Sequence, residues 1–418
     1  MLANIQQGVQ WILGLGASVM LPVIIFFFAL IMGAKPGRAF KSGITIGVGF
    51  IGINLVIALL TSNLGPAAQS LTERLGLKLE IIDIGWPAMS SISWAWVAAG
   101  LMIPIVLVIN FIMLSLKLTK TMDVDIWNYW QFAFVGAGVT SISGSVPWGI
   151  AAGCVCAVIA LLLADVTQPY VEKFFGMPGI SFPHITALGY LPLVIPLNWL
   201  LDKIPGINKW NANPDTIRKK FGIFGEPITM GLILGFILGL LGGESLKNIL
   251  MLGVSMAAVM YLMPKMVAVL MEGLIPVSEV ARDFMAKKFG DRQIYIGLDA
   301  AVALGEPSVI AVGLLLVPIT IFLAVVMPGN GVLPFADLAV IPFIVCLITA
   351  MTKGNIIRAL IIGTIVMACV LLIATNLAPA MTTAAIAAGV DLQGSSQICD
   401  LDRANIITWV LIKIFSLF

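Results

Sequence analysis

The stretch from Ile294 to Leu316 reads IYIGLDAAVALGEPSVIAVGLLL, and it contains two carboxyl groups, those of Asp299 and Glu306. It is otherwise apolar and long enough to lie in a membrane. The two acids are seven residues apart, about two helical turns, so a continuous helix would place both on one face. Gly305 and Pro307 instead predict a helix break beside Glu306.

Two carboxyls beside a helix break predict a polar cavity enclosed by protein. An ionisable side chain near the bilayer centre costs about 2.5–3.5 kcal/mol on insertion scales. Irregular backbone at membrane depth is tolerated only where it is buried in protein or lines a wet cavity. The alternative is that both groups lie near the membrane surface and cap helix ends.

The composition also indicates a membrane protein. Of the 418 residues, 60% are hydrophobic and 11% are charged, and the mean hydropathy is +1.07. Soluble domains are about 25% charged, so a soluble domain of this length could not bury so much apolar surface. The succession of long apolar runs predicts an all-α polytopic membrane protein with about ten or eleven transmembrane helices. A net charge of +2 gives no indication of nucleic-acid binding.

Several other kinds of site are not expected. Most of the five cysteines lie in apolar runs, and with a single histidine in the chain we predict no disulfide, no metal and no cofactor. No phosphate-binding glycine loop followed by Lys and Ser or Thr is present, so the chain is not itself an ATPase. The first ten residues lack a basic region, so a cleaved signal peptide is not expected.

The longest polar stretch divides the chain. Asp202 to Phe221 holds five basic residues against two acidic ones, and its end at Thr216–Phe221 is amphipathic. The positive-inside rule places this stretch in the cytoplasm. We therefore predict a first repeat half over residues 1–201, a cytoplasmic amphipathic linker with a connecting span over 202–247, and a second repeat half over 248–418.

Two segments predict re-entrant hairpins, Ile82–Trp94 and Met327–Ala339, because both place Gly and Pro beside small or polar residues between apolar flanks. Two ordinary surface loops are the alternative. A weak internal repeat pairs Pro87 with Pro334 and the glycines of residues 47–52 with the region around Gly297. Paired halves with broken segments point to a transporter site at the repeat interface, and the repeat is inverted if an odd number of spans separates the halves.

Two polar side chains near helix starts are further candidates. His184, the only histidine, lies between Pro183 and Gly189. Its imidazole can exchange a proton near neutral pH or bind a sugar hydroxyl, although a lone histidine is often a packing residue. Glu226 stands in a second Gly-Glu-Pro tripeptide, where it is either a ligand or a helix N-terminal carboxylate that the helix dipole favours.

Aromatic and amide side chains follow one another near residue 130. The side chains of this run would suit the mixed apolar and hydroxylated faces of a sugar or polyol, although the tryptophans could equally form an interfacial belt; they are Trp127, Asn128, Trp130 and Gln131. Asn54 and Asn110 lie within apolar runs, where bonds between helices are expected rather than contact with a substrate.

Several motifs together resemble one transporter family, the galactitol-specific enzyme IIC proteins of the bacterial phosphotransferase system, grouped with the ascorbate-specific ones. The motifs are MLPVII at 20–25, GVGFIGI at 47–53, DIGWP at 83–87, DVDIWN at 123–128, FGEPIT at 224–229, GLDAA at 297–301 and PGNGVLPFADLA at 328–339. The resemblance runs along nearly the whole chain. It implies a multi-pass protein of the bacterial inner membrane, and a homodimer whose protomer has a core domain and a V-shaped dimerisation domain.

The resemblance also implies an activity and its partners. In this family a cytoplasmic IIB component with a phosphocysteine phosphorylates the sugar as it is delivered, supplied by a IIA component. The phosphoryl-carrying residue is therefore on a separate subunit, which leaves open whether this chain is itself an enzyme. We expect translocation of a sugar alcohol such as galactitol, or of another polyol, coupled to its phosphorylation.

The expected site combines the resemblance with the polar residues above. Asp299 would accept hydrogen bonds from substrate hydroxyls and act as base toward the one that is phosphorylated, and His184 would bind a neighbouring hydroxyl. The remaining polar lining would be Gln131, Glu226 and Glu306, and Trp86 would pack at a hairpin tip. The alternative is a secondary transporter of a hydroxylated or anionic solute, coupled to protons through Asp299 and Glu306.

Overall fold

The computed structural model describes residues 17–74, 79–204, 226–289, 293–334, 336–389 and 396–418. The first ten residues and the predicted amphipathic segment Thr216–Phe221 lie outside these ranges. The described chain is mostly helical and its sheets are small and open, which confirms the predicted all-α polytopic membrane class.

Among the described residues, five helices are long and apolar enough to cross a membrane. A sixth span results if α4 (Trp86–Ala95) and α5 (Ala99–Ser115), which meet at a bend of 91°, are counted together. Other apolar helices have only 10–17 residues. The predicted ten or eleven spans thus include segments too short or too bent to cross alone, because an apolar run also occurs wherever backbone turns inside a protein.

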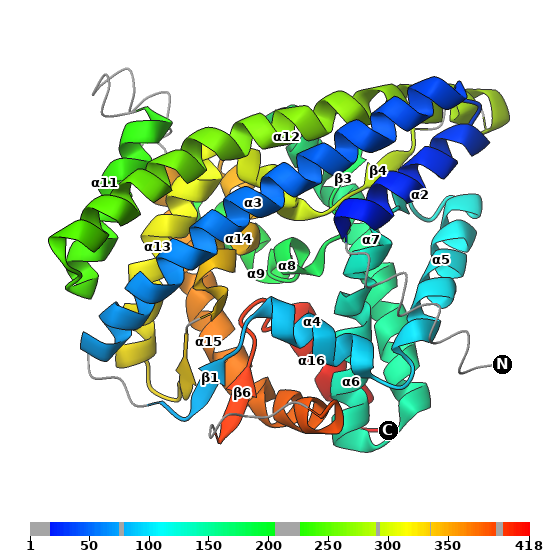
Figure 1. Ribbon diagram of the computed structural model, residues 1–418. Coiled ribbons are helices and arrows are strands. Elements are labelled where there is room, and N and C mark those ends of the chain that lie inside the picture. The colour runs from blue at the N-terminus through cyan, green and yellow to red at the C-terminus, as the bar shows by residue number, and fades with distance from the viewer. Residues whose placement is uncertain (1–16, 75–78, 205–225, 290–292, 335, 390–395) are drawn as a thin grey trace.

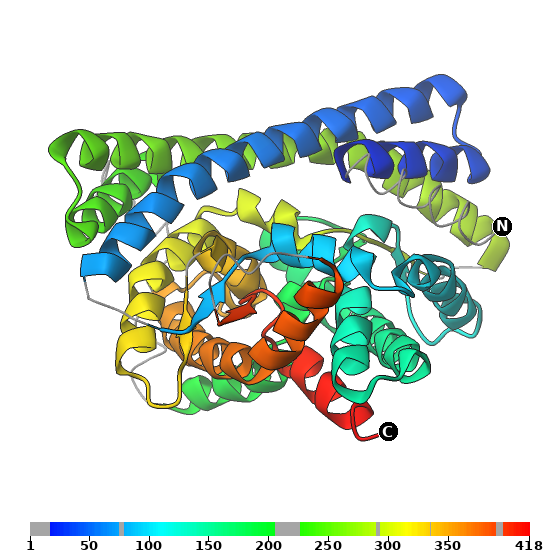
Figure 2. The same cartoon turned by 60° about the horizontal axis from the view of Figure 1, so that its bottom comes forward.

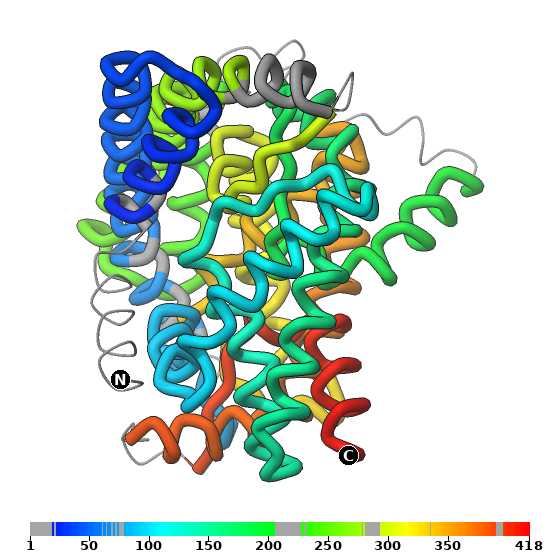
Figure 3. The backbone as a smooth tube through the Cα atoms, turned by 90° about the vertical axis from the view of Figure 1, so that its right-hand side faces the viewer, coloured from blue at the N-terminus to red at the C-terminus, as the bar shows by residue number. Residues whose placement is uncertain are grey.

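Four helices form a separate layer, which we call the arm layer: α2 (Ala17–Ile31), α3 (Pro36–Arg74), α11 (Pro227–Gly242) and α12 (Leu246–Phe289). Figure 2 shows this layer across one face of the other helices, with α3 and α12 side by side. Figure 3 shows it at one side of the molecule and the carboxyl-terminal helix at the other. The arm layer draws from all three predicted segments, 1–201, 202–247 and 248–418, so the spatial layers cut across the predicted sequence halves.

Glycines bring the two long helices of the arm layer together. A Cβ at Gly49 would lie 2.6 Å from Leu270 Cα, and a Cβ at Gly273 would lie 2.9 Å from the carbonyl oxygen of Ser42. Small residues allow membrane helices to approach backbone to backbone, where van der Waals packing replaces the missing hydrophobic drive. The close packing against α12 therefore fixes the position of α3, whose other side lines the cavity described below.

Hydrogen bonds join the far end of α3 to the turn between α11 and α12. Ser70 and Asn248 both donate to Glu244, and these bonds lower the pKa of its carboxyl. Arg74 donates to the carbonyls of Leu240 and Leu241. These contacts satisfy carbonyls that the end of a helix leaves without a partner.

The remaining elements form the core layer (Figure 1). Its other α-helices are α6 (Trp130–Ser143), α7 (Val146–Phe175), α8 (Ile185–Leu188), α9 (Leu191–Lys203), α13 (Pro307–Val326), α14 (Ile341–Met351), α15 (Ile356–Ala387) and α16 (Ile406–Phe415), and its 3₁₀ helices are η1 (Ile126–Tyr129), η4 (Ala300–Gly305) and η5 (Ala336–Val340). The described strands are β1 (Ile81–Asp83), β2 (Thr121–Asp123), β3 (Ile180–Ser181), β4 (Tyr295–Gly297), β5 (Val332–Leu333) and β6 (Gln397–Cys399).

The strands pair into two small parallel sheets of three, in the orders β5-β1-β6 and β2-β4-β3. In the second sheet Asp123 pairs with Gly297, and Gly297 also pairs with Ser181. A Cβ at Gly297 would lie 2.9 Å from Asp123 Cα, so only glycine lets the strands meet there. Because the strands are parallel, their carboxyl ends open at one edge, and the loops that follow them come together.

The predicted hairpin segments meet at the carboxyl edge of the first sheet. Asp337 accepts a hydrogen bond from Trp86 N at 2.9 Å, and its own N–H donates to Asp83 Oδ2 at 2.8 Å. Pro87 and Pro334 thus follow the neighbouring strands β1 and β5. The glycines at 47–52 lie in α3, however, whereas Gly297 lies in β4, and the internal repeat stays a prediction.

Candidate functional site

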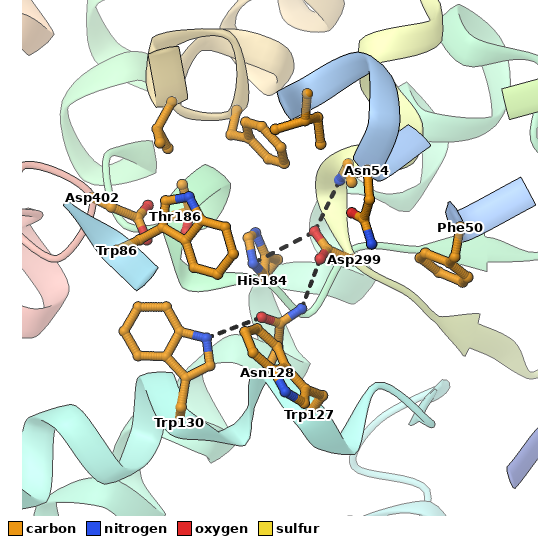
Figure 4. Close-up of a pocket in the computed structure, with 14 residues that line it drawn as sticks. Phe50, Asn54, Trp86, Trp127, Asn128, Trp130, His184, Thr186, Asp299 and Asp402 are labelled. Atoms are coloured by element: carbon orange, nitrogen blue, oxygen red, sulfur yellow. Dashed lines mark hydrogen bonds and ion pairs between the residues drawn. The ribbon is translucent and has the colours of Figure 1, made fainter. Parts of the chain in front are cut away.

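A cavity of about 270 Å³ lies where the arm layer meets the core layer. Phe50, Asn54 and Ile57 of α3 line one side, and loops and helix starts of the core layer line the rest (Figure 4). Its volume is close to the lower end of the about 300–1,000 Å³ typical of small-molecule pockets. The cavity therefore suits a molecule of monosaccharide size.

Asp299 is held at the cavity by the strand before it and the helix after it. It follows β4 and is the N-cap of η4, where its Oδ1 accepts a hydrogen bond from Ala301 N at 2.9 Å. The side chain remains 20% exposed and lines the cavity. Asp299 therefore combines the two roles that the sequence left as alternatives, a helix cap and a cavity carboxyl.

Asn128 joins two carboxyls. Its Nδ2 donates to Asp299 Oδ2 at 2.9 Å and to Asp125 Oδ2 at 2.5 Å. Its Oδ1 accepts from the indole N–H of Trp130 at 3.2 Å, which fixes the orientation of the amide. Both amide hydrogens therefore point at carboxyls, and the second oxygen of Asp299 is held at the cavity wall.

His184 approaches Asp299 from the third strand of the same sheet. It follows β3 and is the N-cap residue of α8, and its Nε2 lies 3.6 Å from Asp299 Oδ1. Its Nδ1 has no hydrogen-bond partner among the described residues. Gln131 is buried behind it, and its Oε1 accepts from Ile185 N at 2.9 Å. Gln131 thus positions the histidine loop but does not line the cavity in the described structure.

Three indoles form much of the apolar wall. Trp86, Trp127 and Trp130 all line the cavity, and the rings of Trp86 and Trp127 meet edge to face at 5.9 Å. Trp130 is almost fully buried. The two tryptophans of this run therefore face the site and do not form an interfacial belt. Aromatic faces pack against C–H groups, while the carboxyls and the imidazole bind hydroxyls, so the cavity can recognise a polyhydroxylated small molecule.

The other predicted acids lie elsewhere in the described structure. Glu306 is the N-cap of α13, and its Oε1 accepts from the hydroxyl of Ser308 at 2.9 Å. Glu226 precedes α11 as its N-cap residue. Neither is among the described residues that line the cavity. Within the described residues no group of three or more His, Cys, Asp and Glu side chains has the arrangement of a metal site.

Sequence reasoning misses one part of the lining and misjudges another. Asn54 is expected only to join helices, yet it lines the cavity, whereas Asn110 does have a structural role and donates to Thr121 O at 2.8 Å. Asp402 and Thr186 also line the cavity and are not predicted. A signal for Asp402 is present, because the pattern Asp-x-Asp-x-x-Asn occurs at 123–128 and again at 400–405.

A cavity of this size, lined by carboxyls, amides and an imidazole, walled by indoles and placed between two layers of membrane helices, defines a transporter of small hydroxylated molecules. Residues 11–394 match the family model described as the PTS system sugar-specific permease component. The chain belongs to that family, and it is a multi-pass protein of the inner membrane.

Two curated relatives, both from Escherichia coli (strain K12), match almost the full length. The PTS system galactitol-specific EIIC component is 41% identical over 408 residues, which are 97% of this chain and 90% of the relative. A putative permease IIC component is 41% identical over 410 residues, which are 98% of this chain and 94% of the relative.

Proposed function

We propose that this chain binds a neutral sugar alcohol of the galactitol type in the cavity and delivers it to a cytoplasmic IIB component for phosphorylation. The observation that carries the substrate class is the lining itself: carboxyls and an imidazole between indole faces. Asp299 and Asp402 line the cavity and Asp125 lies behind Asn128. Arg403 is paired with Asp402, so the like-charge repulsion that disfavours an anionic solute comes from Asp299. Membership of a phosphotransferase family does not favour the proton-coupled alternative.

In the proposed reaction Asp299 is the catalytic residue. A substrate hydroxyl oxygen attacks the phosphorus of the IIB phosphocysteine, the new O–P bond forms as the S–P bond breaks, and the thiolate leaves. The hydroxyl proton passes to the Asp299 carboxylate, whose oxygens are already oriented by Asn128 and Ala301 N. His184, with its Nε2 near Asp299, binds a neighbouring hydroxyl. Phosphoenolpyruvate supplies the phosphoryl group through IIA and IIB.

The position of the cavity suggests how the substrate crosses. Because α3 forms one wall and the core layer the others, a rigid-body movement of the core layer along the arm layer would carry the site from one side of the membrane to the other.

We also propose that the protein is a homodimer joined through the arm layer. Val23 and Val48 are exposed on it, so a single cysteine at either position in a cysteine-free chain should crosslink two copies, and a chain that stays monomeric would contradict the dimer.

The test is uptake of labelled galactitol by cells that express the chain with matching IIA and IIB components and that supply phosphoenolpyruvate and the general phosphoryl carriers upstream of IIA. The expected product is galactitol phosphate, formed only when all components are present. Asp299→Asn should abolish phosphorylation, whereas Glu306→Gln, outside the cavity, should retain it. Accumulation of free galactitol that an uncoupler prevents would overturn the proposal in favour of a proton-coupled carrier.

A further inference from the structure

We propose that Asp402 and Thr186, which Arg403 holds from behind, form a second substrate-binding pole, so that the cavity holds an unbranched sugar alcohol at both ends. The first pole is Asp299 with His184. This inference rests on the proposed function and adds to it the part of the substrate that Asp402 recognises.

Asp402 lines the cavity, and Asp402 and its neighbour Arg403 carry buried polar atoms that have no hydrogen-bond partner among the described residues. Asp402 lines the cavity and is 3% exposed. Its Oδ2 accepts from Arg403 Nη2 at 2.7 Å, but its Oδ1 has no partner among the described residues. Arg403 is fully buried, and its Nε and Nη1 also lack partners within the described part of the chain. Buried polar atoms are expensive to leave unpaired, so a ligand hydroxyl that reaches Asp402 Oδ1 would satisfy that oxygen.

The two poles lie on different sides of the cavity. Figure 4 shows Asp402 and Thr186 on one side of His184, and Asp299 on the other. His184 and Thr186 are two positions apart at the start of α8, and such neighbours do not face each other on a helix. The same short segment therefore serves both poles, with Thr186 accepting a hydrogen bond from Arg403.

The second pole is rigidly held. The N–H of Asp402 donates to Asp337 Oδ2 at 3.1 Å, and Asp337 Oδ1 accepts from Trp86 N. The guanidinium of Arg403 lies 4.6 Å from the ring centre of Trp130, within cation–π range. Asp402 is thus tied to both predicted hairpin tips and to an aromatic wall, and its free oxygen is held in place before any ligand arrives.

The chemistry of the poles specifies the ligand. Each end has a carboxyl that accepts a hydrogen bond from a hydroxyl, and an open-chain polyol has a hydroxyl on both terminal carbons. A sugar acid would bring a carboxylate against Asp299 or Asp402. The geometry therefore favours a neutral, unbranched polyol long enough to reach from Asp299 to Asp402.

The experiment compares galactitol with its two terminal monodeoxy analogues, each of which lacks the hydroxyl at one end. Binding to the full-length protein in lipid nanodiscs is measured by calorimetry for the wild type, Asp402→Asn, Asp299→Asn and Asp400→Asn. Asp400 is the matched control because it is equally buried and its Oδ1 accepts from Arg403 N at 2.8 Å, but it is not among the described residues that line the cavity.

We expect the wild type to bind each deoxy analogue about ten- to a hundredfold more weakly than galactitol, the range for losing a hydrogen bond to a charged group. In Asp402→Asn, one deoxy analogue should bind within about threefold of galactitol, because the pole that its missing hydroxyl would contact is already lost. The other analogue should still bind as much more weakly than galactitol as it does in the wild type. Asp299→Asn should show the reverse pattern, and Asp400→Asn should keep both differences.

Each other outcome has a definite meaning. If galactitol binding requires Asp299, but Asp402→Asn still binds both deoxy analogues more weakly than galactitol, the second pole is refuted and the proposed function stands. If Asp400→Asn removes the difference as Asp402→Asn does, the cluster acts through packing and the pole is also refuted. If Asp402→Asn does not fold, the wild type alone decides. The second pole is overturned if the wild type binds both deoxy analogues with affinities within about threefold of its affinity for galactitol. If the wild type binds no polyol, the proposed function itself fails.

Discussion

Asn128 should be the most sensitive single residue of the site, because its amide keeps two carboxyls in place. Asn128→Ala removes its bonds to Asp125 and Asp299 and the bond that it accepts from Trp130. Bonds to charged groups contribute about 1.5–3 kcal/mol each and neutral ones about 1 kcal/mol, so the upper limit is about 4–7 kcal/mol. Bonds between membrane helices average only about 0.6 kcal/mol, because the unfolded chain also finds partners.

Between these limits we expect Asn128→Ala to lose about 2–4 kcal/mol of stability, since two of the three bonds involve buried or half-buried carboxyls. Galactitol should bind at least about tenfold more weakly, because Asp299 loses the donor that orients Oδ2. Asn128→Asp should be worse than the alanine variant, since it places a third carboxyl against two others.

The assay is the free energy of unfolding in mixed micelles together with galactitol affinity in nanodiscs. Asn110→Ala is the matched control, because the Asn110 amide likewise donates and accepts, with one bond to Thr121 O and one from Asp123 N, but both of its bonds are to backbone groups of β2. It should lower stability by about 1–2 kcal/mol and weaken binding less than Asn128→Ala. If Asn128→Ala were as stable as the wild type and bound galactitol equally well, the bridging role inferred from the distances would be wrong.

Three further predictions concern the supports and walls of the site. Gly297→Ala should abolish galactitol binding and lower stability by about 1–3 kcal/mol, since the new Cβ would lie 2.9 Å from Asp123 Cα; retention of binding in nanodiscs would show that the second sheet can widen. Asp165→Ala should destabilise the protein by about 2–4 kcal/mol, because its carboxyl accepts from Thr121 and two neighbouring donors at 2.8–2.9 Å; unfolding in micelles measures this, and a change below about 0.5 kcal/mol would contradict it. Trp86→Ala should weaken galactitol binding by about tenfold, while Asp299-dependent phosphorylation persists at saturating substrate. Calorimetry measures the affinity, and initial rates measure the phosphorylation.

The class of the protein is predictable from the sequence because hydrophobicity is a property of each residue and adds along the chain. Carboxyls in an apolar stretch are expensive wherever the stretch lies, so the residue types alone are enough to identify Asp299 as a candidate. The break at Glu306 is equally local, because proline stops a helix through its own ring. The motifs around Asp83, Asp123 and Gly297 indicate the family, which the match to the permease family model confirms.

Which residues share the cavity depends on contacts between distant parts of the chain. Asn128, His184 and Asp299 converge because β2, β3 and β4 pair in parallel, and strands of two or three residues are too short to show an alternating pattern in the sequence. Asp402 follows β6 of the other sheet and reaches the cavity through that sheet's pairing with β1, whereas Glu306 caps a helix outside the cavity lining. The sequence by itself thus determined that this protein lies in a membrane and binds a polar molecule there, and the pairing of its short strands decided which side chains bind it.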